Sequence, residues 1–377
     1  MKKMIKRLIG GVIQLLFGHL KIVENKIFLE TGTGEAKDQV RAIYNYIKAN
    51  HPEEYEFIWA LNPLADIEGL CNSEIVYKRT LRYYFHLLTS KYWMRTHSVE
   101  TIVSKRKGQI YIQLWHGPGA TKKEGFDIKG INNNGKVMPH AKEWDYFIAT
   151  DADNQRYIQT ALNLQIPRLL LGSCRTDVLV NRNRDDYYTL RKKLDIKDTD
   201  KVVLYAPTFR EIDFHKEKVS LHIKKLSKTE NVRLILRLHP EIKNKLDIAE
   251  YAENIIDGNK CADIFDLYIL SDILVTDYSS VSIEYSLLMK PFLFYMYDLE
   301  EYTKERDFYY NYLDSLPGPI IKTEDELIYA ISNIDSIMET YHDSYMTYYE
   351  KYNALNDGNV CRRFYNMLKN GDFKQNN

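Results

Sequence analysis

Cysteine is scarce in this sequence, and the few that occur lie far apart. The four are Cys71, Cys174, Cys261 and Cys361, and none forms a Cys-x-x-Cys pair. This spacing argues against a disulfide framework or a zinc site, and it favours a protein kept in a reducing compartment such as the cytoplasm.

The chain also lacks net charge, because 52 basic residues are balanced by 52 acidic ones. A protein that binds nucleic acid in bulk usually carries a basic excess, so no nucleic-acid partner is expected. Internal repeats and low-complexity tracts are absent as well. The sequence therefore reads as that of an ordinary globular protein.

Long apolar runs are missing too. A bilayer span needs roughly 20 apolar residues, and the longest apolar stretch is shorter than that. The N-terminal stretch MKKMIKRLIGGVIQLLFGHLK has an apolar block, but Gly10, Gly11 and Gln14 interrupt it, and no small-x-small cleavage site follows. Two interpretations stay open: an amphipathic helix on a membrane surface, or a helix packed on its own domain. In the first, the headgroups would meet Lys2, Lys3, Lys6 and Arg7, and the aliphatic Ile5, Leu8, Ile9, Val12 and Leu16 would enter the interface.

What is present is an alternation of strand-like and helix-like segments. Apolar runs such as KIFLE, EFIWAL, KVVLYAPT and DILVTDYSS are separated by helix-like stretches, and the pattern restarts after VNRNRDD. Continuous apolar strands alternating with helices predict parallel sheets covered on both faces. A chain of 377 residues exceeds the usual size of one core, so two Rossmann-like domains are predicted. The predicted segments are a surface helix at 1–25, domains at 26–185 and 196–345, and a closing helix and tail at 346–377.

Residues suited to binding or catalysis follow several predicted strands. Thr208 and Arg210 come after VVLYA, His239 after LILRL, Asp277 after ILVT, and His116 with Gly117 after IYIQLW. Ligands of open parallel sheets bind beyond the carboxyl ends of the strands. These residues are therefore the candidates for a binding site.

Ser279 and Ser280 stand directly before the helix-like segment VSIEYSLLM. Free N–H groups and a partial positive charge at a helix start suit a phosphate, and the two hydroxyls add donors. The alternative is a serine that merely caps its helix. Arg210 and His239 at neighbouring strand ends favour phosphate binding, since arginine binds phosphate with two parallel hydrogen bonds.

Five motifs follow one another along the chain: LWHG followed by Lys122, Lys123 and Gly125, then YAPTFR, LRLHP, ILVTDYSS and RDFYYNYLDSLPGP. Together they resemble those of the CDP-glycerol glycerophosphotransferases, the primases and polymerases of teichoic-acid and related capsule synthesis. The resemblance runs from about residue 26 to about residue 335. It implies an α/β fold of GT-B type, with two Rossmann-like domains facing a central cleft. Acceptor recognition would lie in the N-terminal half and the CDP-alditol in the C-terminal half.

The sequence departs from the family pattern on the acceptor side. WHGPGATKKEG is one residue longer than the usual family segment, and LLGSCRTDVL matches the usual pattern at Arg175 and Asp177 but not at Ser173 and Cys174. These departures concern the identity of the acceptor more than that of the donor.

The resemblance implies attack of an acceptor hydroxyl on the β-phosphorus of CDP-glycerol, with CMP leaving. His116 is then the expected base, because a neutral imidazole takes an alcohol proton near pH 7. His239 would hold the pyrophosphate or protonate the leaving side, and His97 is a second candidate histidine. The expected donor site comprises Thr208, Arg210, Asp277, Ser279, Ser280 and, toward the ribose, Glu284, whereas Gly117, Lys122 and Lys123 are expected on the acceptor side.

No metal site is predicted. Asp151 and Asp153 form an Asp-x-Asp pair like that of metal-dependent glycosyltransferases, but they open a polar helix-like segment, and we interpret them as helix-start acids. No tightly bound cofactor is expected, and Mg²⁺ would be held loosely at most. The expected partners are CDP-glycerol or CDP-ribitol, a lipid-linked glycan and the membrane surface, with the protein peripheral on its cytoplasmic face.

The predicted function is therefore transfer of glycerol phosphate to a lipid-linked glycan, with ribitol-phosphate transfer as its variant. One alternative is transfer of a sugar from a nucleotide sugar by an ordinary GT-B glycosyltransferase. A second alternative is a scaffold without catalysis, against which the unbroken set of His, Arg and Ser-Ser argues.

Overall fold

The structure is a computed structural model of the 377-residue chain. It describes residues 2–97, 102–118, 121–131, 134–182, 184–208, 210, 221–238, 251, 255–261, 263–305, 307–310 and 312–374. The chain divides into two compact units, and each is described by itself. Unit 1 comprises Met1–Gly117, Glu124–Asp177 and Leu355–Asn377, and unit 2 comprises Pro118–Lys123 and Val178–Ala354.

Unit 1 is built on a parallel sheet of seven described strands in the order β3-β2-β1-β4-β5-β6-β7. The strands are β1 (Val23–Glu30), β2 (Glu56–Leu61), β3 (Glu74–Tyr77), β4 (Ser90–Arg95), β5 (Ile110–Gln113), β6 (Tyr146–Ala149) and β7 (Arg168–Leu170). β1 and β2 end in unbroken buried runs, as expected for strands covered on both faces.

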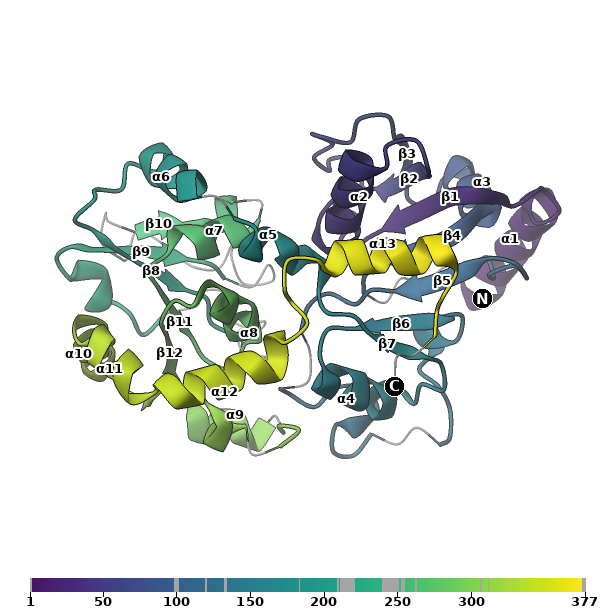
Figure 1. The fold of residues 1–377 in the computed structure, drawn as a ribbon. Coiled ribbons are helices and arrows are strands. Elements are labelled where there is room, and N and C mark those ends of the chain that lie inside the picture. The colour runs from purple at the N-terminus through teal and green to yellow at the C-terminus, as the bar shows by residue number, and fades with distance from the viewer. Residues whose placement is uncertain are drawn as a thin grey trace. The chain divides into compact units, whose positions relative to one another are not determined.

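Helices cover both faces of this sheet (Figure 1). They are α1 (Lys2–Phe17), α2 (Asp38–Asn50), α3 (Leu81–Thr89), α4 (Ala152–Leu162) and α13 (Val360–Asn370). Ile27 and Leu29 of β1 share a core with α2 and α13, whereas Phe28 faces the opposite core with α1, α3 and α4. The alternation of side chains along a strand thus assigns each helix to one face.

Unit 2 is built on a second parallel sheet of six described strands in the order β10-β9-β8-β11-β12-β13. The strands are β8 (Lys201–Tyr205), β9 (Val232–Leu236), β10 (Ile255–Asp257), β11 (Ile273–Thr276), β12 (Phe292–Tyr295) and β13 (Ile320–Ile321). Leu204 and Leu274 point to one core, and Val203 and Val275 point to the other. Both faces are therefore buried here too.

The helices of unit 2 follow its strands or close the chain. They are α6 (Arg184–Lys193), α7 (Ile264–Leu270), α8 (Val281–Tyr285), α9 (Leu299–Glu305), α10 (Glu324–Ser332), α11 (Ile334–Thr340) and α12 (His342–Asn353), while α5 (Asp177–Val180) begins at the last residue of unit 1. α10 starts with a complete capping box, in which Thr323 and Glu326 bind each other's backbone N–H groups.

The N-terminal segment is helical from Lys2 to Phe17 and presents two different faces. One face packs on unit 1, where Ile13 is buried and Phe17 meets Phe85 edge to face at 5.8 Å. The other face is apolar but exposed, and it consists of Met4, Ile5, Leu8, Ile9, Val12, Leu15 and Leu16. Within the described part of the chain, no helix has both the length and the apolarity to cross a membrane.

The prediction of an α/β fold with two parallel sheets is confirmed. The short strands β3, β10 and β13 were not predicted, and each lies at the edge of its sheet or next to it. The chain also returns to unit 1 after α12, since α13 packs on α2. The predicted closing helix and tail, 346–377, are therefore divided between the two units.

Candidate active site

The strand order of unit 1 reverses between β1 and β4, so the carboxyl ends of these neighbours mark the place where open α/β sheets bind ligands. β1 leads into Thr31 and Gly32, and β4 leads into Thr96 and His97. The two loops touch, because a Cβ added to Gly32 would lie 2.6 Å from the Cβ of His97. Only glycine fits so close to the histidine.

His116 follows the next strand, β5, and its ring stacks on that of His97. The ring centroids are 4.2 Å apart and the planes differ by 15°. Burial, followed by the nearby His97, lowers the pKa of His116 to about 3. Burial lowers the pKa of His97 as well. The imidazole of His116 is therefore neutral around pH 7, which is the form that accepts a proton.

A buried ion pair lies at the strand ends from which the two loops start. Glu30 ends β1 and Arg95 ends β4; both are almost fully buried, and Arg95 Nη2 lies 2.8 Å from Glu30 Oε2. The hydroxyl of Tyr83 donates to the same Glu30 oxygen over 2.9 Å. Since an unpaired buried charge would be costly, this pairing fixes the ends of β1 and β4 against each other.

Three further residues of unit 1 that the motifs singled out have defined structural surroundings, while the role of Gly117 toward an acceptor stays a prediction. Gly117 is buried and has φ +139°, a conformation that favours glycine. Arg175, which matches the family pattern, pairs with Asp38 at the start of α2 over 3.0 Å. Asp177 accepts hydrogen bonds from the backbone N–H groups of Val360 and Cys361, and so caps α13.

The strand order of unit 2 reverses between β8 and β11, which brings together three of the predicted donor residues, Thr208, Arg210 and Asp277. Asp277, directly after β11, accepts from the backbone N–H of Thr208 over 2.8 Å and from that of Tyr278 over 2.6 Å. Its other oxygen lies 2.9 Å from Arg210 Nη1. Asp277 thus joins the loops after the two central strands.

Arg210 is held in place by two carboxylates, those of Asp277 and Asp298. Besides Asp277, it meets Asp298 twice, with Nε–Oδ2 at 2.5 Å and Nη2–Oδ1 at 2.9 Å. Burial lowers its pKa, but the two carboxylates outweigh burial, and the net effect raises the pKa. Its guanidinium also lies over the rings of Tyr278 and Tyr302, at 5.1 and 5.0 Å. Arg210 is therefore permanently charged and firmly placed.

The serine pair lies at the start of α8, as predicted, and both serines are partly exposed. Ser280 makes no side-chain cap hydrogen bond in this helix. Tyr278, which precedes them, is buried and stacks on Tyr302 with centroids 3.7 Å apart. Glu284 is buried one turn into α8. Tyr278 anchors the loop in the core, and the two serines are the part of the loop that reaches the surface.

Lys122 and Lys123 were predicted within the first domain, but their backbone pairs with unit 2. Lys122 forms an antiparallel bridge with Phe308, and Lys123 N–H donates to Asp307 O over 2.9 Å. The Lys123 ammonium lies 3.4 Å from the Asp307 carboxylate. The role of these lysines toward an acceptor stays a prediction.

Of the predicted residues that remain, the structure describes Asp151 but not His239. Asp151 is the N-cap of α4 and accepts from Asn154 N–H over 2.8 Å, which confirms it as a helix-start acid. Burial raises its pKa to about 6. His239 lies outside the described residues. Among those that are described, no group of three or more His, Cys, Asp or Glu side chains could hold a metal ion.

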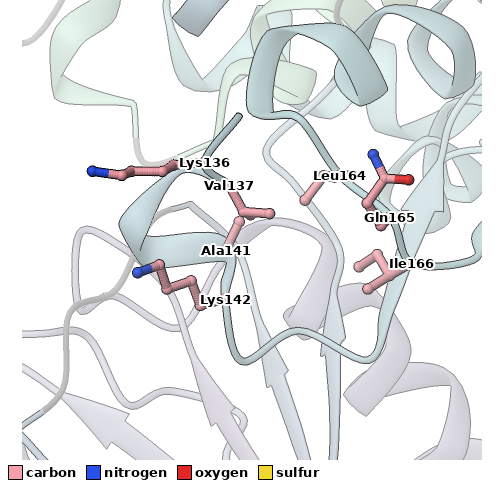
Figure 2. A pocket seen from close by; sticks show the side chains of 7 residues that line it. All are labelled: Lys136, Val137, Ala141, Lys142, Leu164, Gln165 and Ile166. Atoms are coloured by element: carbon pink, nitrogen blue, oxygen red, sulfur yellow. The ribbon is translucent and has the colours of Figure 1, made fainter. Parts of the chain in front are cut away.

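A separate cavity of about 250 Å³ lies near the β7 edge of the first sheet, beside the segments that precede β6 and β7 (Figure 2). It is lined by Lys136, Val137, Ala141, Lys142, Leu164, Gln165 and Ile166. None of the predicted site residues contributes to it. The cavity is therefore distinct from the candidate site.

Sequence reasoning missed two side chains that organise these loops, Gln113 and Asp298. Gln113 ends β5 and is fully buried, and its amide binds backbone groups of His97 and Trp115. Asp298 lies 88 residues beyond its partner Arg210. A buried amide at the end of an apolar strand was the available signal for Gln113, whereas no sequence signal identified Asp298.

Comparison with known proteins identifies the family of the chain and several similar proteins. Residues 14–370 match the family model described as CDP-Glycerol:Poly(glycerophosphate) glycerophosphotransferase. The teichoic acid glycerol-phosphate transferase of Staphylococcus aureus is 30% identical over 385 residues, which cover 96% of this chain and 98% of that protein. A teichoic acid poly(glycerol phosphate) polymerase of Staphylococcus epidermidis is also 30% identical, but the match covers 89% of this chain and only 49% of that protein.

Among solved structures, the wall teichoic acid polymerase TagF soaked with CDPG superimposes with a TM-score of 0.86 at 26% identity, covering 97% of this chain and 93% of that one. This likeness confirms the predicted GT-B type of α/β fold. With a family model that spans nearly the whole sequence, the chain belongs to the CDP-glycerol:poly(glycerophosphate) glycerophosphotransferase family, whose relatives are named as transferases and polymerases of teichoic-acid synthesis.

Proposed function

We propose that this protein transfers glycerol phosphate from CDP-glycerol to a hydroxyl of a lipid-linked glycan and releases CMP, in the synthesis of teichoic acid or a related cell-wall or capsule polymer. The observation that carries the proposal is His116, whose partly buried imidazole is neutral and lies beside the switch point of unit 1. The family description supplies the donor class.

His116 acts as the general base in this proposal. Its neutral ring removes the proton of the acceptor hydroxyl as the oxygen attacks the β-phosphorus. With a pKa near 3, the His116 imidazole is a weak base as long as no donor is bound. A donor with two phosphates adds negative charge near the ring, which raises the pKa toward neutrality. The ring therefore becomes a stronger base when the donor is bound.

The loops of unit 2 hold the donor in this proposal. Arg210, permanently charged and held by Asp277 and Asp298, stabilises the charge that develops on the phosphates. The partly exposed hydroxyls of Ser279 and Ser280 supply hydrogen-bond donors, and the Thr208 hydroxyl, whose oxygen has no hydrogen-bond partner among the described residues, adds another. His239 completes the set as the group that assists departure of CMP.

The exposed apolar face of α1 supports a position at the cytoplasmic surface of the membrane. Seven large apolar side chains share this face, and the sequence around them contains Lys2, Lys3, Lys6 and Arg7. Cationic residues near an anionic surface contribute about 1 kcal/mol each, and inserted aliphatic side chains add to this. A lipid-linked acceptor would then be reached without a membrane-spanning segment.

Product analysis tests the proposed reaction. The purified full chain is incubated with a lipid-linked disaccharide and, separately, with CDP-glycerol, CDP-ribitol or a UDP-sugar, and the products are identified by mass spectrometry. Addition of glycerol phosphate with release of CMP is expected only from CDP-glycerol, and the His116→Ala variant should give almost none. Addition of ribitol phosphate instead would reassign the donor, and transfer of a sugar would reject the proposal.

A further inference from the structure

We propose that His97 and Gln113 are positioning residues for His116: the His97 ring stacks on His116 and limits the pair to a single proton, and Gln113 holds the two turns that carry the rings. This inference deepens the proposed function and rests on its assignment of His116 as the base. It concerns three residues of unit 1 at the ends of the neighbouring strands β4 and β5.

The two turns have the same unusual backbone conformation. His97 has φ +60° after β4, and Trp115, the residue before His116, has φ +55° after β5. Residues other than glycine adopt this left-handed region at a cost and keep it only where the surroundings enforce it. Such a conformation at two adjacent strand ends indicates that the structure fixes the direction of both rings.

Gln113 is the residue that connects the two turns. It is fully buried and stands beside Arg95 in the β4–β5 register. Its Nε2 donates to His97 O over 2.9 Å, and its Oε1 accepts from Trp115 N–H over 3.0 Å. Both ends of one amide are thus bound to the two turns, and a shift of either turn would leave a buried polar group without its partner.

His97 is itself confined on two sides. The Cβ of His97 lies so close to Gly32 that an added side chain there would meet it at 2.6 Å, and Nδ1 of His97 lies 3.0 Å from Thr96 Oγ1. His116, in contrast, has a buried Nδ1 without a hydrogen-bond partner in the described part of the chain. The stack on His97 and a tilted contact with Trp115 are therefore what orients the His116 ring.

The electrostatic effect follows from the spacing of the rings. Two imidazolium rings 4.2 Å apart repel each other, so protonation of one opposes protonation of the other and the pair titrates as a unit. The charged groups that act on the pair come from several elements: Lys37, Lys78 and Arg175 disfavour protonation and Asp38 favours it. Burial acts in the same direction as the cations and is the largest effect.

The pH dependence of transfer separates this role from a merely structural one. His97→Asn removes the ring but keeps a residue that tolerates positive φ, whereas His97→Phe keeps a stacking ring without a titrating group. In His97→Asn the acid limb of kcat should move up by about one pH unit, and kcat should fall roughly tenfold to a hundredfold. His97→Phe should recover most of kcat, because the ring that orients His116 is restored.

His51 provides a matched control. It also stacks on an aromatic ring, Tyr365, with centroids 3.8 Å apart and planes 8° apart, but it lies at the C-terminal end of α2, away from the switch point of unit 1. His51→Asn should leave the acid limb and kcat unchanged. An acid limb that stays in place in His97→Asn would overturn the proposal.

A titration by NMR tests the same point without any activity measurement. The full chain is labelled in its histidine rings, and the His116 signals are identified by their loss in His116→Asn. They should stay in the neutral form down to at least pH 5, and their midpoint should rise in His97→Asn and in Gln113→Met, which keeps the length of the side chain without its hydrogen bonds. A His116 midpoint near the ordinary 6.5 in the unmodified chain would overturn the inference, whether or not the protein proves to be a transferase.

Discussion

Arg210 and Asp298 form a two-pronged ion pair in unit 2, with Nε–Oδ2 at 2.5 Å and Nη2–Oδ1 at 2.9 Å. Asp277 binds the same guanidinium, so one cation faces two carboxylates and the cluster has a net charge of −1. In the proposed donor site, an incoming pyrophosphate would compete with Asp298 for Arg210. The ion pair therefore holds the arginine in place and also weakens its attraction for an anion.

Asp298→Asn is expected to strengthen binding of CDP-glycerol. Removing one negative charge beside Arg210 should contribute about 0.5–1 kcal/mol, or a few-fold in Kd. Arg210→Ala should weaken binding by on the order of 1.5–3 kcal/mol, because a charged hydrogen bond is lost. Calorimetry with CDP-glycerol measures both, and Asp325→Asn, which removes an exposed ion-pair partner of Lys225, is the control. Equal Kd values for all the variants would place the donor elsewhere.

His116→Ala should abolish transfer while leaving donor affinity nearly intact. The base acts on the acceptor hydroxyl, so its loss should lower kcat by roughly 10²- to 10⁴-fold. Single-turnover kinetics with a soluble acceptor analogue, together with calorimetry of CDP-glycerol, separate the two effects. His342→Ala, on the exposed surface of α12, serves as the control. A variant with full activity would end the assignment of His116 as the base.

Acid should destabilise the fold through His116. Its pKa in the folded protein is about 3, below the ordinary value of about 6.5, so the unfolded chain binds the proton first as pH falls. Stability should therefore be highest above about pH 6.5 and decline toward pH 3, with His116 contributing about 2 kcal/mol of that loss by pH 5.

Denaturant titrations at several pH values measure this decline. His86, whose pKa burial lowers to about 4, should contribute in the same direction. His116→Asn should reduce the pH dependence between 6.5 and 5, whereas His342→Asn should not. A His116→Asn variant with the same pH slope as the unmodified chain would contradict the depressed pKa.

Charges placed on the exposed face of α1 should release the protein from membranes. Leu8 and Leu15 are 64% and 78% exposed, so Leu8→Glu with Leu15→Glu should not disturb the packing of Ile13 on unit 1. Each lost insertion should cost roughly 1.5–3 kcal/mol of binding to anionic vesicles, which co-sedimentation measures. Leu64→Glu, at a residue that is 98% exposed in unit 1, is the control. Unchanged sedimentation of the double variant would leave α1 as a packing element only.

Transfer should not depend on a tightly held metal. The donor charge is met in our proposal by Arg210, His239 and the loop at Ser279. Dialysis against EDTA should therefore reduce kcat by only a few-fold, since a loosely bound Mg²⁺ would assist without being required. Complete loss of activity in EDTA that returns with magnesium would contradict this expectation. It would also reopen the acids at Asp151 and Asp153, although Asp151 is occupied as a helix cap.

The predictions from sequence succeeded where local patterns determine structure. The central strands β1, β2, β8 and β11 are continuous apolar runs, and such runs are typical of sheets covered on both faces. β13 has only two residues, and β3 and β10 are short and incompletely buried, so no comparable pattern marks them. The strand-end rule selected His116, Thr208, Arg210 and Asp277 as candidates without knowledge of the strand order, and the structure places them after β5, β8 and β11.

The contacts that could not be predicted from the sequence depend on which strands are neighbours in the sheet. Gln113 binds the turn at His97 only because β4 and β5 are adjacent in the sheet. Asp298 reaches Arg210 because the ends of β8 and β12 flank β11. Lys122 and Lys123 looked like part of the first domain because the chain continues there, yet their bridge to Phe308 assigns them to unit 2. Long-range pairing of this kind has no signal in a single sequence.

The return of α13 to unit 1 decides how the protein can be divided in the laboratory. Val360, Phe364 and Leu368 fill the same core as Ile27 and Leu29, and Asp177 caps the helix that carries them. A gene fragment that stops near residue 185 would express a sheet with a bare apolar surface. A soluble version of unit 1 must instead splice residues 355–374 onto the fragment, and a short linker would have to replace residues 178–354.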